Sequence, residues 1–230
     1  MSSADPRQPA RAAPAVERTS IPGPAGALEA VIEEPGGSSP HFAVVCHPHP
    51  LYGGTLDNKV VTTAARALQQ LRIPTVRFNF RGVGASAGRF DQGVGETDDA
   101  AAVVEWGMRR WPGRSLVLAG FSFGAYVALR LARTRPAAHT ILIAPPVALF
   151  AFAGLEAPAG SWLVIQGDQD EVVDPAGVNA WTATFTPPPR LVLMPGAGHF
   201  FHGRLPELRD AVISQIDPER LNPLNRPESA

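Results

Sequence analysis

The sequence has a single cysteine, Cys46, so it can form neither an intrachain disulfide nor a thiolate-rich zinc site. Charged side chains make up only 18% of the 230 residues, and 20 Lys and Arg nearly balance 21 Asp and Glu. No basic run is long enough to follow a phosphate backbone, and no apolar run approaches the 18 residues that a membrane span requires. The first 20 residues also lack the apolar core of a secretory signal. These absences argue against nucleic acid and membrane as partners and favour the cytoplasm.

The composition is that of one globular domain with a tail at each end. Hydrophobic residues make up 45% of the chain, which is long enough for a single α/β core. The 24 prolines and 22 glycines are unevenly spread. Residues 1–16 are rich in Pro, Ala and Arg without periodicity, and residues 217–230 are polar with three prolines. We therefore expect a domain over residues 17–216, between a disordered N-terminal tail and a flexible C-terminal one.

Within that domain, short apolar runs alternate with segments of helical period, which predicts a mostly parallel, doubly wound α/β sheet with helices on both faces. The predicted strands are Leu28–Glu33, Phe42–His47, Thr75–Phe80, Leu116–Gly120, Thr140–Ala144, Trp162–Gln166 and Leu191–Met194. The predicted helices are Asn58–Leu71, Asp98–Trp111, Phe123–Arg135, Pro175–Phe185 and Leu205–Ile216.

A candidate nucleophile follows the fourth of these strands. Residues 120–124 read Gly-Phe-Ser-Phe-Gly and open a helical segment, which is the strand–turn–helix setting of a nucleophile elbow. Small flanking residues permit the sharp turn that would lift the Ser122 hydroxyl above the sheet edge. The alternative is a packing turn in which Ser122 only caps the helix.

A serine needs a base, and that base needs a carboxylate to fix its tautomer. His199 follows the last predicted strand through a glycine-rich turn at the same sheet edge. Three aspartates follow the preceding strand. We favour Asp170 as the acid, with Asp168 as a turn-former and Asp174 as the N-cap of the next helix.

An oxyanion hole needs two N–H donors. Phe123, directly after the serine, supplies one. The other must come from the loop after the strand ending near Cys46, where His49, Leu51 and Tyr52 compete and Leu51 is favoured. Tyr52 and Phe201 are predicted to line the substrate pocket, with Phe200 a further candidate.

The segments Cys46–Val61, Arg77–Ser86 and Gly120–Gly124, with the contexts of Asp170 and His199, resemble the α/β-hydrolase superfamily over residues 27–216. Within it, the sequence is most similar to small capless bacterial serine hydrolases related to dienelactone hydrolases and carboxylesterases. The chain order serine, aspartate, histidine is that of this fold. The resemblance implies cleavage of esters or thioesters without a cofactor. Dienelactone hydrolases carry cysteine at the elbow, so Ser122 favours an ordinary carboxylesterase.

Rival interpretations of other residues are weaker. Residues 82–87 satisfy the dinucleotide pattern G-x-G-x-x-A, but further glycines intervene before the next helix. A metal site at Cys46, His47 and His49, or at His199 and His202, lacks further ligands at defined spacing. We therefore expect no metal. Cys46 is interpreted as a core side chain.

The expected function is hydrolysis of small, soluble, short-acyl esters through an acyl-enzyme. A thioesterase, peptidase or acyltransferase could use the same three residues, and a non-catalytic or nucleotide-binding module is a remote alternative. Residues 145–160 are too few for a large lid, which predicts an open site. The sequence leaves the natural substrate and a homodimer open.

Overall fold

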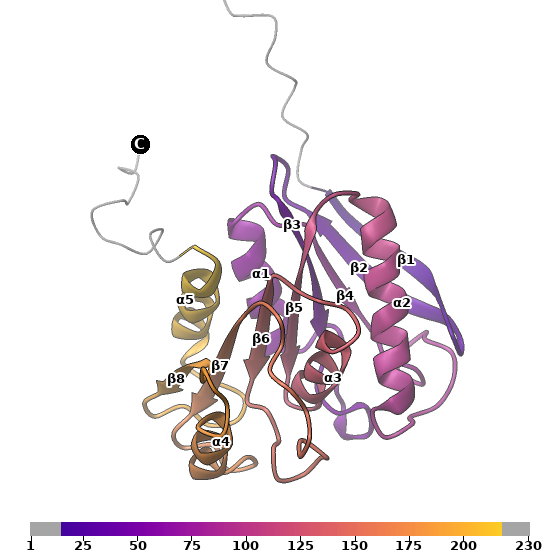
Figure 1. Ribbon diagram of the computed structural model, residues 1–230. Coiled ribbons are helices and arrows are strands. Elements are labelled where there is room, and N and C mark those ends of the chain that lie inside the picture. The colour runs from indigo at the N-terminus through magenta and orange to yellow at the C-terminus, as the bar shows by residue number, and fades with distance from the viewer. Residues whose placement is uncertain (1–14, 218–230) are drawn as a thin grey trace, which may run out of the picture.

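The computed structural model describes residues 15–217, which form one open sheet covered by helices on both faces (Figure 1). The predicted tails 1–16 and 217–230 lie outside this range except for residues 15, 16 and 217. Within the described range the strands are β1 (Ala15–Gly23), β2 (Gly26–Glu34), β3 (His41–Cys46), β4 (Thr75–Phe78), β5 (Ser115–Phe121), β6 (His139–Ile143), β7 (Ser161–Gly167) and β8 (Arg190–Met194). The helices are α1 (Lys59–Gln70), α2 (Val94–Arg110), α3 (Phe123–Ala132), α4 (Pro175–Thr182) and α5 (Leu205–Ile216), with a 3-10 turn η1 (Pro50–Tyr52).

The sheet has the strand order β1-β2-β4-β3-β5-β6-β7-β8. Strands β1 and β2 form an antiparallel hairpin, β2 pairs antiparallel with β4, and all further pairs are parallel. In the register of β3 and β5, Cys46 lies opposite Gly120. The loops that follow these two strands therefore leave the sheet side by side, which is where ligands bind in open α/β sheets.

Apolar side chains fill two cores, one on each face of the sheet. Helices α1 and α5 cover one face, and α2, α3 and α4 cover the other (Figure 1). Strand β3 shows the alternation that this requires, because Phe42, Val44 and Cys46 face the α2–α3 side while Ala43 and Val45 face α1.

Strand β1 was not predicted from the sequence. Most of its side chains are exposed, and Ile21 is its only fully buried residue. An edge strand of a hairpin shows little hydrophobic patterning because it packs on few neighbours. The described strands therefore number eight, against seven predicted, and β1 begins at Ala15, inside the segment expected to be a tail.

Helix α2 begins at Val94, four residues earlier than predicted. The side chain of Glu96 accepts hydrogen bonds from Asp91 N–H and Gly93 N–H and thereby caps the helix. Asp99 lies inside the helix and is fully buried, where its carboxylate receives the backbone N–H and the guanidinium of Arg81. The glycine-rich turn at residues 81–87 is thus fixed by a buried ion pair.

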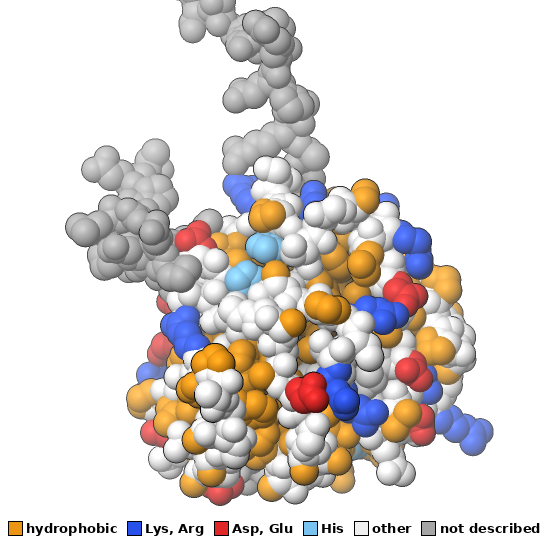
Figure 2. All heavy atoms as spheres, in the orientation of Figure 1, with side chains coloured by type: hydrophobic (Ala, Val, Ile, Leu, Met, Phe, Trp, Pro, Cys, Tyr) orange, Lys and Arg blue, Asp and Glu red, His pale blue; other side chains and the backbone are white. Residues whose placement is uncertain are grey.

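The segment between β6 and β7, residues 144–160, contains turns but no helix. Two of its aromatic side chains, Phe150 and Phe152, pack against Tyr126 of α3. The segment therefore covers a helix of the domain and forms no large cap. No helix within residues 15–217 is long and apolar enough to cross a membrane. Charged side chains of both signs are interspersed on the face seen in Figure 2.

Candidate active site

Ser122 occupies a strained turn between β5 and α3. Its φ of 53° and ψ of −121° are uncommon for a residue with a side chain. The flanking glycines make the turn sterically feasible: a Cβ on Gly120 would lie 2.1 Å from the Gly124 oxygen, and one on Gly124 would lie 2.3 Å from the Cys46 oxygen. The predicted strand–turn–helix elbow is present, and the start of α3 packs closely against the end of β3.

The predicted serine, histidine and aspartate meet at the carboxyl edge of the sheet. The Ser122 hydroxyl lies 3.1 Å from His199 Nε2, and His199 Nδ1 lies 2.9 Å from Asp170 Oδ2. His199 is only 3% exposed. A nucleophile within hydrogen-bond reach of a base, itself oriented by a buried carboxylate, is the arrangement that activates a serine.

Asp170 is held as a carboxylate. Its Oδ1 accepts hydrogen bonds from the N–H groups of Val172 and Val173, and its Oδ2 accepts one from Gln166 as well as one from His199. Burial would raise the pKa of Asp170, but the hydrogen bonds from His199, Val173 and Val172 outweigh it and lower the pKa below its ordinary value. The charged form can therefore stabilise a histidine that gains a proton.

The two loops that carry Asp170 and His199 are tied together by neighbouring acids. Asp168 Oδ1 accepts the N–H of Gly196 at 2.7 Å, so Asp168 bridges the loops in place of the predicted local turn. Glu171 Oε2 accepts the backbone N–H of His199 at 3.1 Å. Asp174 caps α4 as predicted, through the N–H groups of residues 176 and 177. Sequence reasoning missed Glu171, because its partner lies 28 residues away.

Several N–H groups near Ser122 have no acceptor within the described part of the chain, and two of them are candidates for an oxyanion hole. That of Phe123 opens α3, where the first N–H groups lack intrahelical partners. The other is the N–H of His49. The preference for Leu51 is wrong, because the Leu51 N–H donates to His49 Nδ1 at 3.1 Å. The Tyr52 N–H donates to the His49 oxygen. Of the three candidates, only His49 keeps its donor available.

His47 holds the loop that carries His49. Its Nδ1–H donates to the Pro48 oxygen at 2.6 Å, and its Nε2 accepts the N–H of Phe80 at 3.0 Å. Burial lowers the pKa of His47 to about 4, although its hydrogen bond to Pro48 acts in the opposite direction. His47 is therefore neutral at pH 7, with both ring nitrogens engaged.

A pocket of about 390 Å³ opens beside the serine. Its lining comprises Pro48, His49, Tyr52, Gly53, Gly54, Asn58, Ser122, Val172, His199 and Phe200. Tyr52 therefore lies where it was predicted. The prediction for Phe201 is wrong, since its side chain is fully buried in the core beneath α1 and α5. Phe201 has a φ of 52°, and this turn places Phe200, not Phe201, at the pocket.

The other ligand interpretations find little support in this geometry. Within residues 15–217, no group of three or more His, Cys, Asp and Glu side chains could hold a metal ion. Cys46 is fully buried, and burial raises the pKa of its thiol. The glycine-rich turn after β4 leads into a loop held by Arg81 and Asp99, so it does not open a helix as a dinucleotide site requires.

A serine on a strand–helix elbow, a histidine and an aspartate from later loops, and a mostly parallel sheet are the features of an α/β hydrolase. The chain belongs to the α/β serine hydrolase family. This confirms the fold class and the resemblance stated from the sequence, including the absence of a large cap from the described domain.

Two solved structures support this assignment, and a third relative shows a similar sequence. An α/β serine hydrolase homologue from Coxiella burnetii is 49% identical over 87% of this chain and 97% of its own, with a TM-score of 0.84. An α/β serine hydrolase without lid from Xanthomonas campestris is 46% identical over 93% and 97%, with a TM-score of 0.85. An uncharacterized protein of Rickettsia prowazekii is 35% identical over 83% of this chain and 84% of its own. Residues 53–152 match the family described as serine aminopeptidase S33.

Proposed function

We propose that the protein is a carboxylesterase that hydrolyses small, uncharged, short-acyl esters through an acyl-enzyme on Ser122. The observation that carries this proposal is the continuous chain of contacts from Ser122 Oγ through the His199 ring to Asp170. A small-molecule ester as the partner, a cytoplasmic location and the absence of a cofactor belong to the same proposal.

In the first half of the reaction, Ser122 Oγ attacks the ester carbonyl carbon while His199 Nε2 takes the hydroxyl proton. The carbonyl oxygen becomes an oxyanion, which the N–H groups of Phe123 and His49 stabilise. The carbon–oxygen bond to the alcohol then breaks, and His199 returns its proton to the leaving oxygen. Asp170 stabilises the imidazolium that exists between these steps.

In the second half, water attacks the acyl-enzyme and His199 takes a proton from it. The second tetrahedral intermediate collapses, the acid leaves, and the proton returns to Ser122 Oγ. Water reaches the acyl-enzyme because the pocket is open and residues 15–217 form no large cap over it. Thioester hydrolysis and acyl transfer use the same steps with another leaving group or acceptor.

A peptidase is the second candidate, because residues 53–152 match a family described as serine aminopeptidase. An aminopeptidase must accommodate the charged α-amino group of its substrate, for which a carboxylate is the natural partner. None of the side chains that line the pocket is acidic. This difference favours an uncharged ester over a peptide with a free N-terminus.

The two candidates are separated by turnover of matched chromogenic substrates. We expect hydrolysis of p-nitrophenyl butyrate, with little turnover of leucine or alanine p-nitroanilide, and loss of the ester activity in Ser122→Ala. Efficient release of p-nitroaniline, with ester turnover that survives Ser122→Ala, would favour the peptidase and remove the ester from the proposal.

A further inference from the structure

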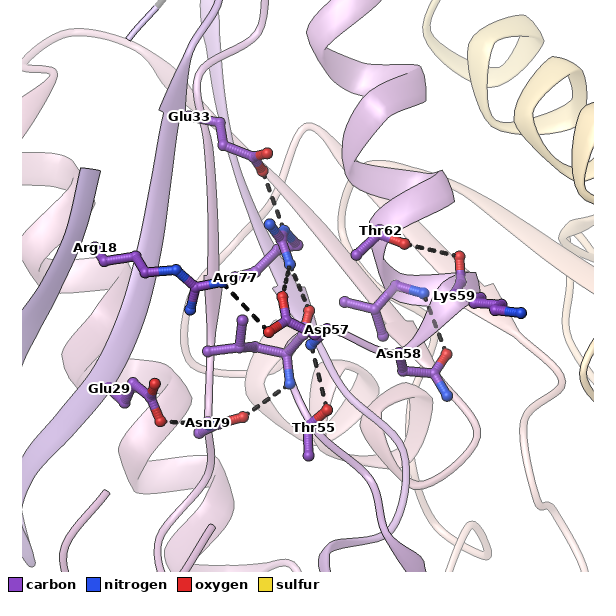
Figure 3. Close-up of polar contacts among 12 residues, drawn as sticks. Arg18, Glu29, Glu33, Thr55, Asp57, Asn58, Lys59, Thr62, Arg77 and Asn79 are labelled. Atoms are coloured by element: carbon purple, nitrogen blue, oxygen red, sulfur yellow. Dashed lines mark hydrogen bonds and ion pairs between the residues drawn. The ribbon is translucent and has the colours of Figure 1, made fainter. Parts of the chain in front are cut away.

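Asn58 is a polar pocket residue that the proposed mechanism does not use. It is the N-cap of α1, and its Oδ1 accepts the N–H groups of Val60 at 2.9 Å and Val61 at 3.5 Å. Capping fixes the orientation of the side-chain amide, because the oxygen must face the helix. The NH2 group therefore points away from the helix start (Figure 3).

That NH2 group donates to no residue within the described part of the chain, while Asn58 as a whole is only half-buried and lines the pocket beside Ser122. An amide nitrogen carries two donor hydrogens. No Lys, Arg, Asp or Glu is among the residues that line the pocket. The pocket thus offers a neutral donor and no charged side chain.

The loop before Asn58 is anchored by buried polar side chains of β4 and its end (Figure 3). Arg77 is only 6% exposed, and its Nη1 donates to the Leu56 oxygen at 2.6 Å and to Asp57 Oδ1 at 3.1 Å. Asn79 is also buried, and its Oδ1 accepts the N–H of Leu56 at 2.8 Å. These bonds fix the backbone directly before Asn58, so its NH2 group is presented in a constrained position.

Most residues that line the pocket come from two parts of the chain, the loop after β3 and the loops after β7 and β8. His199 must protonate the leaving oxygen, so the alcohol leaves on the side of His199 and its pocket neighbours Val172 and Phe200. Asn58 comes from the other part of the lining, on the loop that continues from His49. An acyl group opposite the departing alcohol would then lie toward this second part.

We propose that Asn58 is a specificity-determining residue whose NH2 group donates a hydrogen bond to an uncharged oxygen near the carbonyl carbon of the acyl group. The favoured substrates are then short alkoxy-, hydroxy- or oxo-acyl esters. This inference rests on the proposed esterase function and names the substrate class of the same site.

The test compares pairs of p-nitrophenyl esters that differ by one oxygen in place of a methylene: methoxyacetate against butyrate, and 3-methoxypropionate against pentanoate. For each pair, kcat/KM of the ester with the extra oxygen is divided by kcat/KM of its alkyl counterpart. This ratio is measured for the wild-type protein and for Asn58→Asp and Asn58→Ser. Aspartate and serine preserve the N-cap but remove the amide donor. Comparing the ratios between proteins cancels the intrinsic reactivity of each ester.

Lys59→Gln is the matched control. It makes the same change of net charge as Asn58→Asp at the adjacent, exposed residue, which does not line the pocket. Thermal unfolding of each variant establishes that the cap of α1 is retained.

In at least one pair, we expect the ratio to fall about fivefold in both Asn58 variants, as for loss of one neutral hydrogen bond, and to stay at the wild-type value in Lys59→Gln. Unchanged ratios in both pairs would overturn the inference while leaving the esterase proposal intact. A second control pair, 2-methoxyethyl acetate against butyl acetate, differs in the alcohol. If the Asn58 variants lowered the ratio only in this pair, Asn58 would contact the alcohol, and its assignment to the acyl group would be overturned. Failure of the wild-type protein to hydrolyse any of these esters would instead count against the esterase proposal.

Discussion

The carboxylate of Glu171 accepts the backbone N–H of His199 at 3.1 Å, while the adjacent Asp170 holds the ring of the same histidine at 2.9 Å. Two consecutive acids of the loop after β7 therefore fix both the backbone and the side chain of His199. The Glu171 side chain positions the histidine without contact to the Ser122 hydroxyl.

Removal of this bond in Glu171→Ala is expected to lower kcat about three- to tenfold, because one hydrogen bond of moderate strength is lost and the His199 loop gains freedom. Glu171→Gln keeps a side-chain oxygen that can accept the bond and serves as the control. Steady-state ester hydrolysis measures both. A loss in Glu171→Gln as large as that in Glu171→Ala would show that charge, not the hydrogen bond, is what Glu171 provides.

The three aspartates of the same loop should differ sharply. Asp170→Asn is expected to lower kcat by roughly 10³- to 10⁴-fold, because asparagine favours the wrong tautomer of His199 and cannot stabilise the imidazolium. Asp168→Asn and Asp174→Asn keep oxygens that accept the same backbone N–H groups, so losses below about tenfold are expected. The same kinetic assay applies, and Asp168→Asn as the most damaging change would contradict the role of Asp170.

His47 should make stability dependent on pH. Its pKa is lowered from 6.5 to about 4 in the folded protein, so the unfolded chain binds more protons between these values. The stability it contributes is present above pH 6.5 and is lost as the pH falls toward 4. From pH 7 to pH 4.5 this loss is about 2 to 3 kcal/mol.

The measurement is urea unfolding of the wild-type protein and of His47→Gln at both pH values. The variant is expected to be less stable at pH 7 but to lose about 2 to 3 kcal/mol less than the wild type on acidification. The difference between the two proteins isolates His47 from His41, His49 and His139, whose pKa values burial also lowers. Equal losses would mean that His47 titrates normally.

The open pocket predicts a preference for short acyl chains. Each buried methylene contributes about 0.8 kcal/mol only while a wall covers it, and residues 15–217 form no large cap above the pocket of about 390 Å³. In a series of p-nitrophenyl esters, kcat/KM should peak at roughly two to six acyl carbons, with no increase when the substrate forms micelles. A peak at long chains with interfacial activation would require a covering segment.

Buried and strongly patterned parts of the chain were predictable from the sequence. The seven predicted strands and five helices all occur, α5 with its predicted bounds and the others with shifted ends. The glycines around Ser122 indicate the elbow, because a Cβ at either position would clash with the backbone. His199 and Asp170 could be placed because parallel strands bring their following loops to one edge. The hairpin strand β1 escaped prediction because its exposed side chains carry no periodic signal.

The fine geometry of the pocket depends on contacts that the sequence does not encode locally. The second oxyanion-hole donor could be His49, Leu51 or Tyr52 by sequence. Leu51 is excluded by a side-chain contact, because its N–H donates to His49 Nδ1. Phe200 lines the pocket in place of the predicted Phe201 because Phe201 has a positive φ. In a tight turn, two consecutive side chains point in different directions, so an error of one position exchanges the core residue for the pocket residue.

Covalent labelling tests the central role of Ser122 most directly. A fluorophosphonate reacts with a serine only where a base activates it and N–H groups stabilise the resulting oxyanion. Incubation of the folded protein with a fluorophosphonate, followed by peptide mass spectrometry, is expected to place one adduct on Ser122. His199→Ala should abolish that adduct without unfolding the protein. An adduct on another serine, or equal labelling of Ser122 in His199→Ala, would contradict activation of Ser122 by His199.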